Sequence, residues 1–233
     1  MYHSVGKVCN KEEGELIYCI SEENFKKQLE IINIFNKRQS DSSNKVVITF
    51  DDGDETNYSI AYPLLKKYGL NAAFFIIGSR VGTPGYMDWV QIKKLQFDGM
   101  IIGSHGMTHR ILPLLDDRDL FYELGESKRL LESRIGCVVE YFSIPRGFCN
   151  KRILTFAKKI GYKKVFTSDL VGNSFEYGRI AIKRDWDSKI FLGILKGKIP
   201  FWYFINSAIK KHVIWVLGVS NYDRLRTKVL GLW

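Results

Sequence analysis

Two short groups of residues in this chain have the types and spacing of a site that could bind a divalent metal ion and accept a proton. Asp51 and Asp52 stand side by side before Gly53, and one carboxylate of such a pair can bind a metal ion while the other accepts a proton. His105 and His109 are four residues apart, a spacing that one helical turn brings to the same side. Two imidazoles and one carboxylate form a facial set that holds a divalent ion such as zinc and leaves positions open for water and substrate.

Each group taken alone has a simpler explanation. An Asp-Gly pair is common turn chemistry and can cap a following helix. A single histidine is usually structural. The combination is harder to explain in that way, because the acidic pair and the histidine pair each follow directly on a predicted strand.

The elements that must position these groups alternate along the chain. Short apolar runs rich in β-branched and aromatic residues predict buried strands, and the segments between them have helical periodicity. We expect helices over 22–37, 58–68, 89–97, 116–134 and 151–160. We expect strands over 46–50, 72–77, 100–103, 138–144 and 164–167, with a further extended run over 179–183.

This alternation predicts an α/β fold with a parallel sheet covered by helices, either an open doubly wound sheet or a barrel. Polar residues gather after Phe50, Gly103 and Ile144, where three of the predicted strands end. In both architectures the functional site is built at the carboxyl ends of the strands, so we expect these three loops to converge on one pocket.

The motifs resemble a known family, the polysaccharide deacetylases of the NodB homology type, or carbohydrate esterase family 4. The resemblance rests on T-F-D-D-G at 49–53 and S-H-x-x-x-H at 104–109, and it continues through F-S-I-P at 142–145. It covers roughly residues 1 to 185. It implies an incomplete (β/α)7-type barrel and a metal-dependent hydrolase that removes acetyl groups from sugars.

Carried over residue by residue, the resemblance implies that Asp52, His105 and His109 bind the metal and that Asp51 is the general base. The expected metal is zinc, with cobalt, nickel or manganese as alternatives. The tetrahedral oxyanion would be held by the metal and by a backbone N–H at the third motif.

The third motif departs from the family pattern. The backbone N–H for the oxyanion falls on Arg146, which follows Pro145, and Arg146 replaces an aromatic residue of the family. Ser143 stands where many members have the arginine that orients the base. We expect that role to fall to Arg184 or to Arg146, although a salt bridge with a nearby aspartate explains Arg184 equally well.

The final motif of the family, Leu-x-His, which supplies the general acid, is absent near the C-terminus. His212 lies in a basic segment and reads as a surface residue. His3 is the better candidate, because Tyr2-His3 resembles the N-terminal Tyr-His motif of circularly permuted members. Relatives carry a strand before that motif, so either the first strand is short or the true start lies upstream of Met1.

Net charge is concentrated near the C-terminus. Of the net +10, +6 lies in residues 196–233, which hold seven Lys and Arg, one acid and three of the five tryptophans. We therefore divide the chain into a catalytic domain over 1–195 and a short, basic, aromatic tail over 196–233, which we expect to be helical. Basic residues interleaved with aromatic ones suit a membrane interface, so we expect peripheral contact through residues 200–233, against the alternative of a packed helix pair with a solvated face.

The expected function is hydrolysis of the acetamide of an N-acetylated sugar in a surface polysaccharide or its lipid-linked precursor. An O-acetyl esterase and a catalytically silent scaffold for glycan assembly are the alternatives. No nucleic-acid partner is expected, because the positive net charge is the one feature that would support such a partner. The first residues lack the pattern of a secretory signal, which suggests a cytoplasmic protein resting on the inner face of a membrane.

Overall fold

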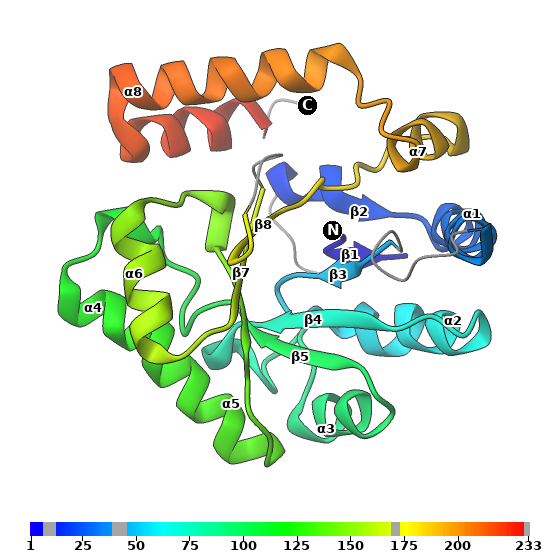
Figure 1. Cartoon of the computed structure of the whole chain (residues 1–233), viewed down its shortest axis with the longest axis horizontal. Helices are drawn as coiled ribbons and strands as arrows, with labels where there is room; N and C mark the ends of the chain where they lie inside the picture. The colour runs from blue at the N-terminus through cyan, green and yellow to red at the C-terminus, as the bar shows by residue number, and fades with distance from the viewer. Residues whose placement is uncertain (7–12, 39–45, 169–172, 231–233) are drawn as a thin grey trace.

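The computed structural model describes residues 1–6, 13–38, 46–168 and 173–230. Within these ranges a parallel sheet of six strands curls into an incomplete barrel, with the strand order β3-β4-β5-β6-β7-β8 (Figure 1). The predicted α/β fold and incomplete barrel are therefore confirmed. The strands are β3 (Ile48–Phe50), β4 (Ala72–Ile76), β5 (Ile101–Ser104), β6 (Tyr141–Ser143), β7 (Lys164–Thr167) and β8 (Glu176–Gly178).

The inner strands form because most of their residues are buried on both faces of the sheet, as parallel strands covered by helices require, whereas β8 at the edge is largely exposed. All five residues of β4 are buried, and the rings of Phe50 and Phe74 stack with their centroids 4.9 Å apart. Helices surround the sheet (Figure 1). They are α1 (Glu22–Arg38), α2 (Tyr62–Lys67), α3 (Trp89–Phe97), α4 (Asp117–Phe121), α5 (Ser127–Ile135), α6 (Lys151–Ile160) and α7 (Ser188–Leu195).

The first residues of the chain extend the sheet beyond β3. Tyr2 forms a parallel bridge with Phe50, donating its N–H to the Thr49 carbonyl (2.7 Å) and accepting from the Asp51 N–H (3.0 Å). The chain then continues into β1 (Ser4–Val5), which pairs with β2 (Cys19–Ile20). His3 therefore lies next to the acidic loop that follows β3.

Several predicted elements differ from those observed. The helix expected over 58–68 begins with a π turn, η3 (Asn57–Ala61), which continues into α2. The long helix expected over 116–134 runs as α4 and α5 joined by a π turn, η6 (Tyr122–Glu126). The strand expected over 138–144 is confined to β6, because helix side chains bind the backbone before it: Val139 donates to Glu132 Oε1, and the Val139 carbonyl accepts from Lys128.

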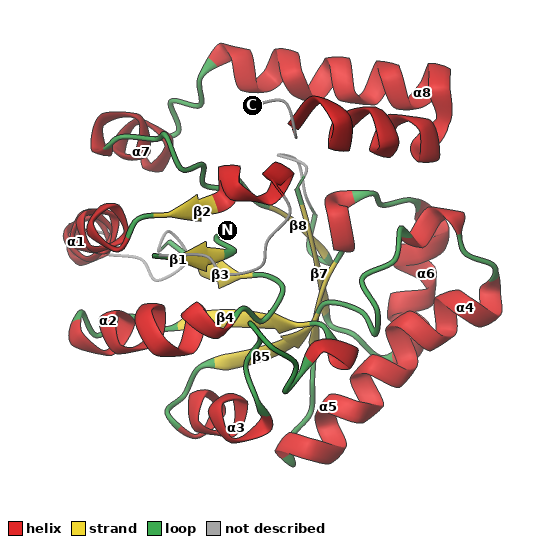
Figure 2. Cartoon of the chain, turned by 180° about the vertical axis from the view of Figure 1, so that it is seen from behind, coloured by secondary structure: helices red, strands yellow, loops and turns green. Residues whose placement is uncertain are grey.

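The run expected over 179–183 is not a strand. The last strand, β8, ends at Gly178, and the chain then passes beside the first residue, where Ile182 donates to the Met1 carbonyl (2.9 Å). After α7 comes α8 (Phe201–Leu230), which breaks at Gly218 into two limbs that run alongside each other (Figures 1 and 2). The tail is therefore helical from Phe201 to Leu230, as predicted.

Candidate metal centre

The loop after β3 presents both carboxylates to the open end of the barrel. Asp52 and Gly53 both have positive φ, 75° and 77°, so the backbone turns sharply after the strand. A non-glycine residue in this conformation is strained, and such strain persists where the surrounding structure holds it. Asp51 is 3% exposed and Asp52 is 9% exposed.

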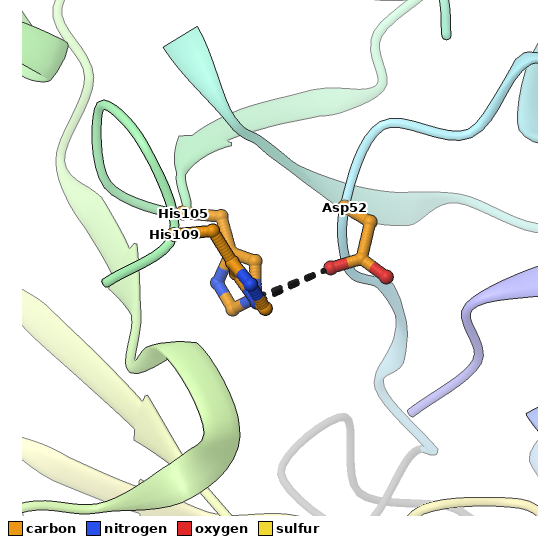
Figure 3. Close-up of side chains that lie close together, drawn as sticks. All are labelled: Asp52, His105 and His109. Atoms are coloured by element: carbon orange, nitrogen blue, oxygen red, sulfur yellow. Dashed lines mark ion pairs between the residues drawn. The ribbon is translucent and has the colours of Figure 1, made fainter. Parts of the chain in front are cut away.

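The loop after β5 places the two histidines beside that acidic loop. The N–H of His105 donates to the Ile76 carbonyl at the end of β4 (2.8 Å), which anchors the start of the loop. His109 has a φ of 65°, so this residue too is held in the left-handed region. The imidazoles lie with their centroids 4.9 Å apart and face the Asp52 carboxylate (Figure 3).

The distances among these three side chains fit a single divalent cation. Asp52 Oδ1 lies 3.5 Å from His105 Nε2 and 3.6 Å from His109 Nε2. Ligands about 2.1 Å from a tetrahedral zinc ion stand roughly 3.4 Å from each other. Asp52, His105 and His109 therefore form a candidate metal site with one carboxylate and two imidazoles.

Both imidazoles are prepared to act as ligands. His105 Nδ1 lies 2.9 Å from the Ser143 carbonyl, and a proton donated there leaves the Nε2 lone pair facing Asp52. Burial, with a smaller contribution from the neighbouring His105, lowers the pKa of His109 to about 3. Since a metal binds only the neutral imidazole, this side chain needs no deprotonation at neutral pH.

A buried glutamate holds the loop that carries the histidines. Glu123 is fully buried in the π turn η6, and its Oε2 accepts from the N–H groups of Met107 and Thr108, both at 2.9 Å. Its Oε1 accepts from the Thr108 hydroxyl. A Cβ on Gly106, whose φ is 81°, would lie 2.9 Å from Oε2, so glycine permits this close approach. The π turn η6 thus carries the carboxylate that holds the histidine loop, and π turns of this kind are common at functional sites.

Asp51 is bound by an arginine that the sequence analysis did not select. Arg179, directly after β8, donates Nη1 to Asp51 Oδ1 and Nη2 to Asp51 Oδ2, both at 2.8 Å. Ser143 Oγ donates to Asp51 Oδ2 (3.0 Å) and accepts from Arg179 Nη2 (2.6 Å). The guanidinium is also bound to Thr49 Oγ1 (3.1 Å) and lies over the ring of Phe75. Asp51 is thereby fixed in one orientation.

This pairing decides the charge state of Asp51. Burial raises the pKa of this carboxyl group, but the charge of Arg179, with contributions from His105 and His3, outweighs burial and holds the pKa well below its usual range. Asp51 is therefore an ionised carboxylate at neutral pH. Its Oδ2 lies 4.0 Å from His105 Nε2, at the edge of the candidate metal site.

The two arginines expected to orient the base lie elsewhere. Arg146 pairs with Asp223 of α8, and Arg184 is exposed, with its backbone N–H donating to the Ile17 carbonyl (2.8 Å). The expectation for them is corrected: Arg179 makes the contact. Functional sites form at the carboxyl ends of parallel strands. A correct prediction of β8 would therefore have indicated Arg179 as a site residue.

The other predicted residues lie around the same opening. His3 packs its ring on Tyr18 at 4.8 Å between centroids, and its charge makes a small contribution to the low pKa of Asp51. Pro145 is buried. Arg146 has a φ of 56°, the third strained non-glycine residue of the site loops.

A parallel barrel with two imidazoles and one carboxylate converging at the ends of its strands defines a (β/α)-barrel protein with a candidate mononuclear metal site. Residues 38–165 match the family model described as polysaccharide deacetylase. The chain belongs to the polysaccharide deacetylase family, as its motifs predicted.

Individual proteins show the same relationship. The Bacillus subtilis protein YxkH is 35% identical over 139 residues, which cover 60% of this chain and 50% of that protein. A peptidoglycan-N-acetylglucosamine deacetylase from Bacillus cereus is 32% identical over 124 residues, 53% of this chain and 56% of that protein. The chain thus spans about half the length of the curated relatives it matches.

The fold agrees with solved structures. The Streptococcus pyogenes deacetylase PplD, solved in complex with acetate, superposes with a TM-score of 0.71 at 21% identity. The match covers 85% of this chain and 96% of that one. At this identity the likeness shows the fold, which supports the incomplete barrel.

Proposed function

We propose that this chain is a metal-dependent deacetylase that hydrolyses the acetamide of an N-acetylated sugar in a surface polysaccharide or its lipid-linked precursor. The observation that carries the proposal is the pairing of a three-ligand site, Asp52, His105 and His109, with an ionised Asp51 at its edge. The substrate class is supported by the relative that acts on N-acetylglucosamine in peptidoglycan. Residues 1–195 would form the catalytic domain and residues 196–233 a tail.

The chain's own residues account for the proton transfers. The chemistry that a divalent cation supplies in such a site is polarisation of the acetyl carbonyl and acidification of water. Asp51, held ionised by Arg179, accepts the proton of the water that attacks the carbonyl carbon. The backbone N–H of Arg146 stabilises the oxyanion. As the carbon–nitrogen bond breaks, His3 donates a proton to the nitrogen, and the products are acetate and the free amine.

Removal of the metal tests this function directly. The protein should release acetate from a β-1,4-linked N-acetylglucosamine trimer, and a chelator should reduce the rate at least about 100-fold, because several kcal/mol of transition-state stabilisation are lost. Zinc, cobalt, nickel or manganese should restore it. An O-acetylated sugar assayed in parallel separates amide from ester hydrolysis. A purified protein that binds no metal and releases no acetate would instead favour the scaffold.

We also propose that the tail contacts a membrane surface. Within the described residues, no helix combines the length and apolar character that crossing a bilayer requires. However, α8 exposes Ile209 and Val216, seven residues apart and so on one helical stripe, together with Leu217. Exposed Arg224 and Lys228 add positive charge that attracts anionic headgroups. This arrangement suits a helix lying in the interface.

Substitution of the apolar stripe tests the membrane contact. Val216→Asp with Leu217→Asp should reduce sedimentation with vesicles that contain phosphatidylserine by about 100-fold, since burying two such side chains stabilises binding by about 3 kcal/mol. Val90→Asp is the control, because Val90 is 76% exposed on α3. Equal sedimentation of the two variants would exclude this stripe as the contact.

A further inference from the structure

A cleft of about 340 Å³ lies beside the candidate metal centre. One of its walls includes His109, a proposed ligand, and the neighbouring Arg110. Another wall includes Arg146 and, from the far end of the chain, Asp223 of α8. The C-terminal helix thus contributes a side chain to the surroundings of the site.

The second limb of α8 is brought to the barrel by a chain reversal and two contacts. Gly218 has φ 76° and ψ 162°, a conformation that is essentially restricted to glycine, and the helix breaks there. Arg146 Nη1 then donates to both carboxylate oxygens of Asp223, at 2.9 and 3.1 Å. The neighbouring Tyr222 packs edge-on against Phe148, with centroids 5.9 Å apart.

The lining of the cleft offers an apolar surface and a polar surface, which complement the C–H face and the hydroxyl groups of a sugar ring. Ile111, Leu114 and Leu115 supply an apolar side, against which the C–H face of a pyranose can pack. Arg146 and Asp223 supply planar charged groups, whose hydrogen bonds suit adjacent hydroxyls. The volume is at the small end for small-molecule sites, so the cleft suits one or two sugar units rather than a long segment.

We propose that the second limb of α8 forms a wall of the sugar-binding cleft and that Asp223, held by Arg146, is a substrate-binding residue that accepts hydrogen bonds from hydroxyls of the sugar next to the acetamide. This inference rests on the proposed function and extends it, because it assigns part of the tail to substrate recognition. The apolar stripe of α8 and Asp223 then serve different partners.

Stability of the fold does not account for Asp223 at this position. It is the one acid in residues 196–233, among seven Lys and Arg. Its ion pair with Arg146 is partly open to solvent, with side-chain exposures of 15% for Asp223 and 32% for Arg146. Ion pairs of this kind contribute little to stability. Loss of the carboxylate should therefore show in sugar binding more than in folding.

The test compares Asp223→Asn on two substrates. For the β-1,4-linked N-acetylglucosamine trimer, kcat/KM should fall about tenfold, mainly through KM, because a hydrogen bond to a charged acceptor is weakened. For 4-nitrophenyl acetate, which has no sugar hydroxyls, the fall should be several-fold smaller. Asp117→Asn is the matched control, since Asp117 is a 72% exposed acid on α4 whose partner is Arg152.

Equal losses on both substrates, or no loss on either, would overturn the role of Asp223 in sugar binding. If the wild-type protein releases no acetate at all, the proposed function fails, and calorimetric titration of the trimer into the zinc-loaded protein decides the inference separately. Weaker trimer binding by Asp223→Asn than by Asp117→Asn supports it. Trimer binding that Asp223→Asn leaves unchanged, or no binding to the wild type, refutes it.

Discussion

Asp51→Asn should lower kcat for acetate release by about 10²- to 10⁴-fold, the range typical of losing a general base. The physical reason is that the amide cannot accept the proton of the attacking water. The same substitution should leave zinc affinity nearly unchanged, because Asp51 lies at the edge of the three-ligand cluster and not within it. The measurements are steady-state kinetics and calorimetric titration with zinc.

Asp52→Asn is the matched comparison, since it removes the same charge one residue away. This variant should lose zinc affinity as well as activity, because Asp52 Oδ1 is the oxygen that faces both imidazoles. The two adjacent carboxylates would thus be separated by their effect on metal binding. Retention of activity by Asp51→Asn to within tenfold of the wild type would rule out Asp51 as the base. Thermal melting of each variant shows whether the fold is kept.

The three candidate metal ligands could be predicted because they lie in two short sequence segments. Asp52 follows one strand and the two histidines follow another, and parallel strands bring such loops to one edge of the sheet. Elements with clear end signals were also predicted well. Helix α6 begins after Asn150, whose side chain accepts from the Ile153 N–H, and ends at Gly161 with a φ of 92°.

The residues that hold these ligands and Asp51 in place could not be predicted in the same way, because they act over long sequence separations. Arg179 is 128 residues from Asp51, and no motif distinguishes it among 35 Lys and Arg. Glu123 lies in what reads as an ordinary helix, and only the fold shows its carboxylate turned toward the histidine loop. Buried charges of this kind are revealed by their partners and not by their own sequence context.

The tail illustrates the same limit. Composition predicted a basic, aromatic, helical segment, and α8 is helical. Composition did not indicate that Gly218 would reverse the chain or that Asp223 would return to Arg146 beside the site. A single glycine in a helical pattern usually costs some stability without changing direction. Here its conformation decides which part of the tail faces the cleft.

Replacing Arg179 by Met should destabilise the protein by about 3–5 kcal/mol at neutral pH and reduce activity severely, because the buried carboxylate of Asp51 loses its partner. Met keeps much of the side-chain volume, so the loss reflects the missing charge and hydrogen bonds more than a cavity. Arg184→Met is the control. Arg184 is exposed, and its substitution should change the free energy of unfolding by less than about 0.5 kcal/mol.

The effect of Arg179→Met should depend on pH in a defined direction. In the wild type the pKa of Asp51 lies below its value in the unfolded chain, so the ion pair stabilises the fold above the unfolded pKa of about 3.9 and is lost as the pH falls through the folded pKa. Without Arg179, burial dominates and raises the pKa of Asp51. The ionised carboxylate then destabilises the variant at neutral pH, and protonation relieves this as the pH falls.

The stability difference between wild type and Arg179→Met should therefore be largest near neutral pH and shrink on acidification. Urea unfolding at about pH 7 and about pH 4.5 measures this difference. If the variant keeps some activity, the acid limb of its pH–rate profile should lie at higher pH than that of the wild type. A difference that is constant across this range would mean that Arg179 contributes packing and not charge. In that case Arg179 would not be what keeps Asp51 ionised, and the proposed mechanism would need another source for that charge state.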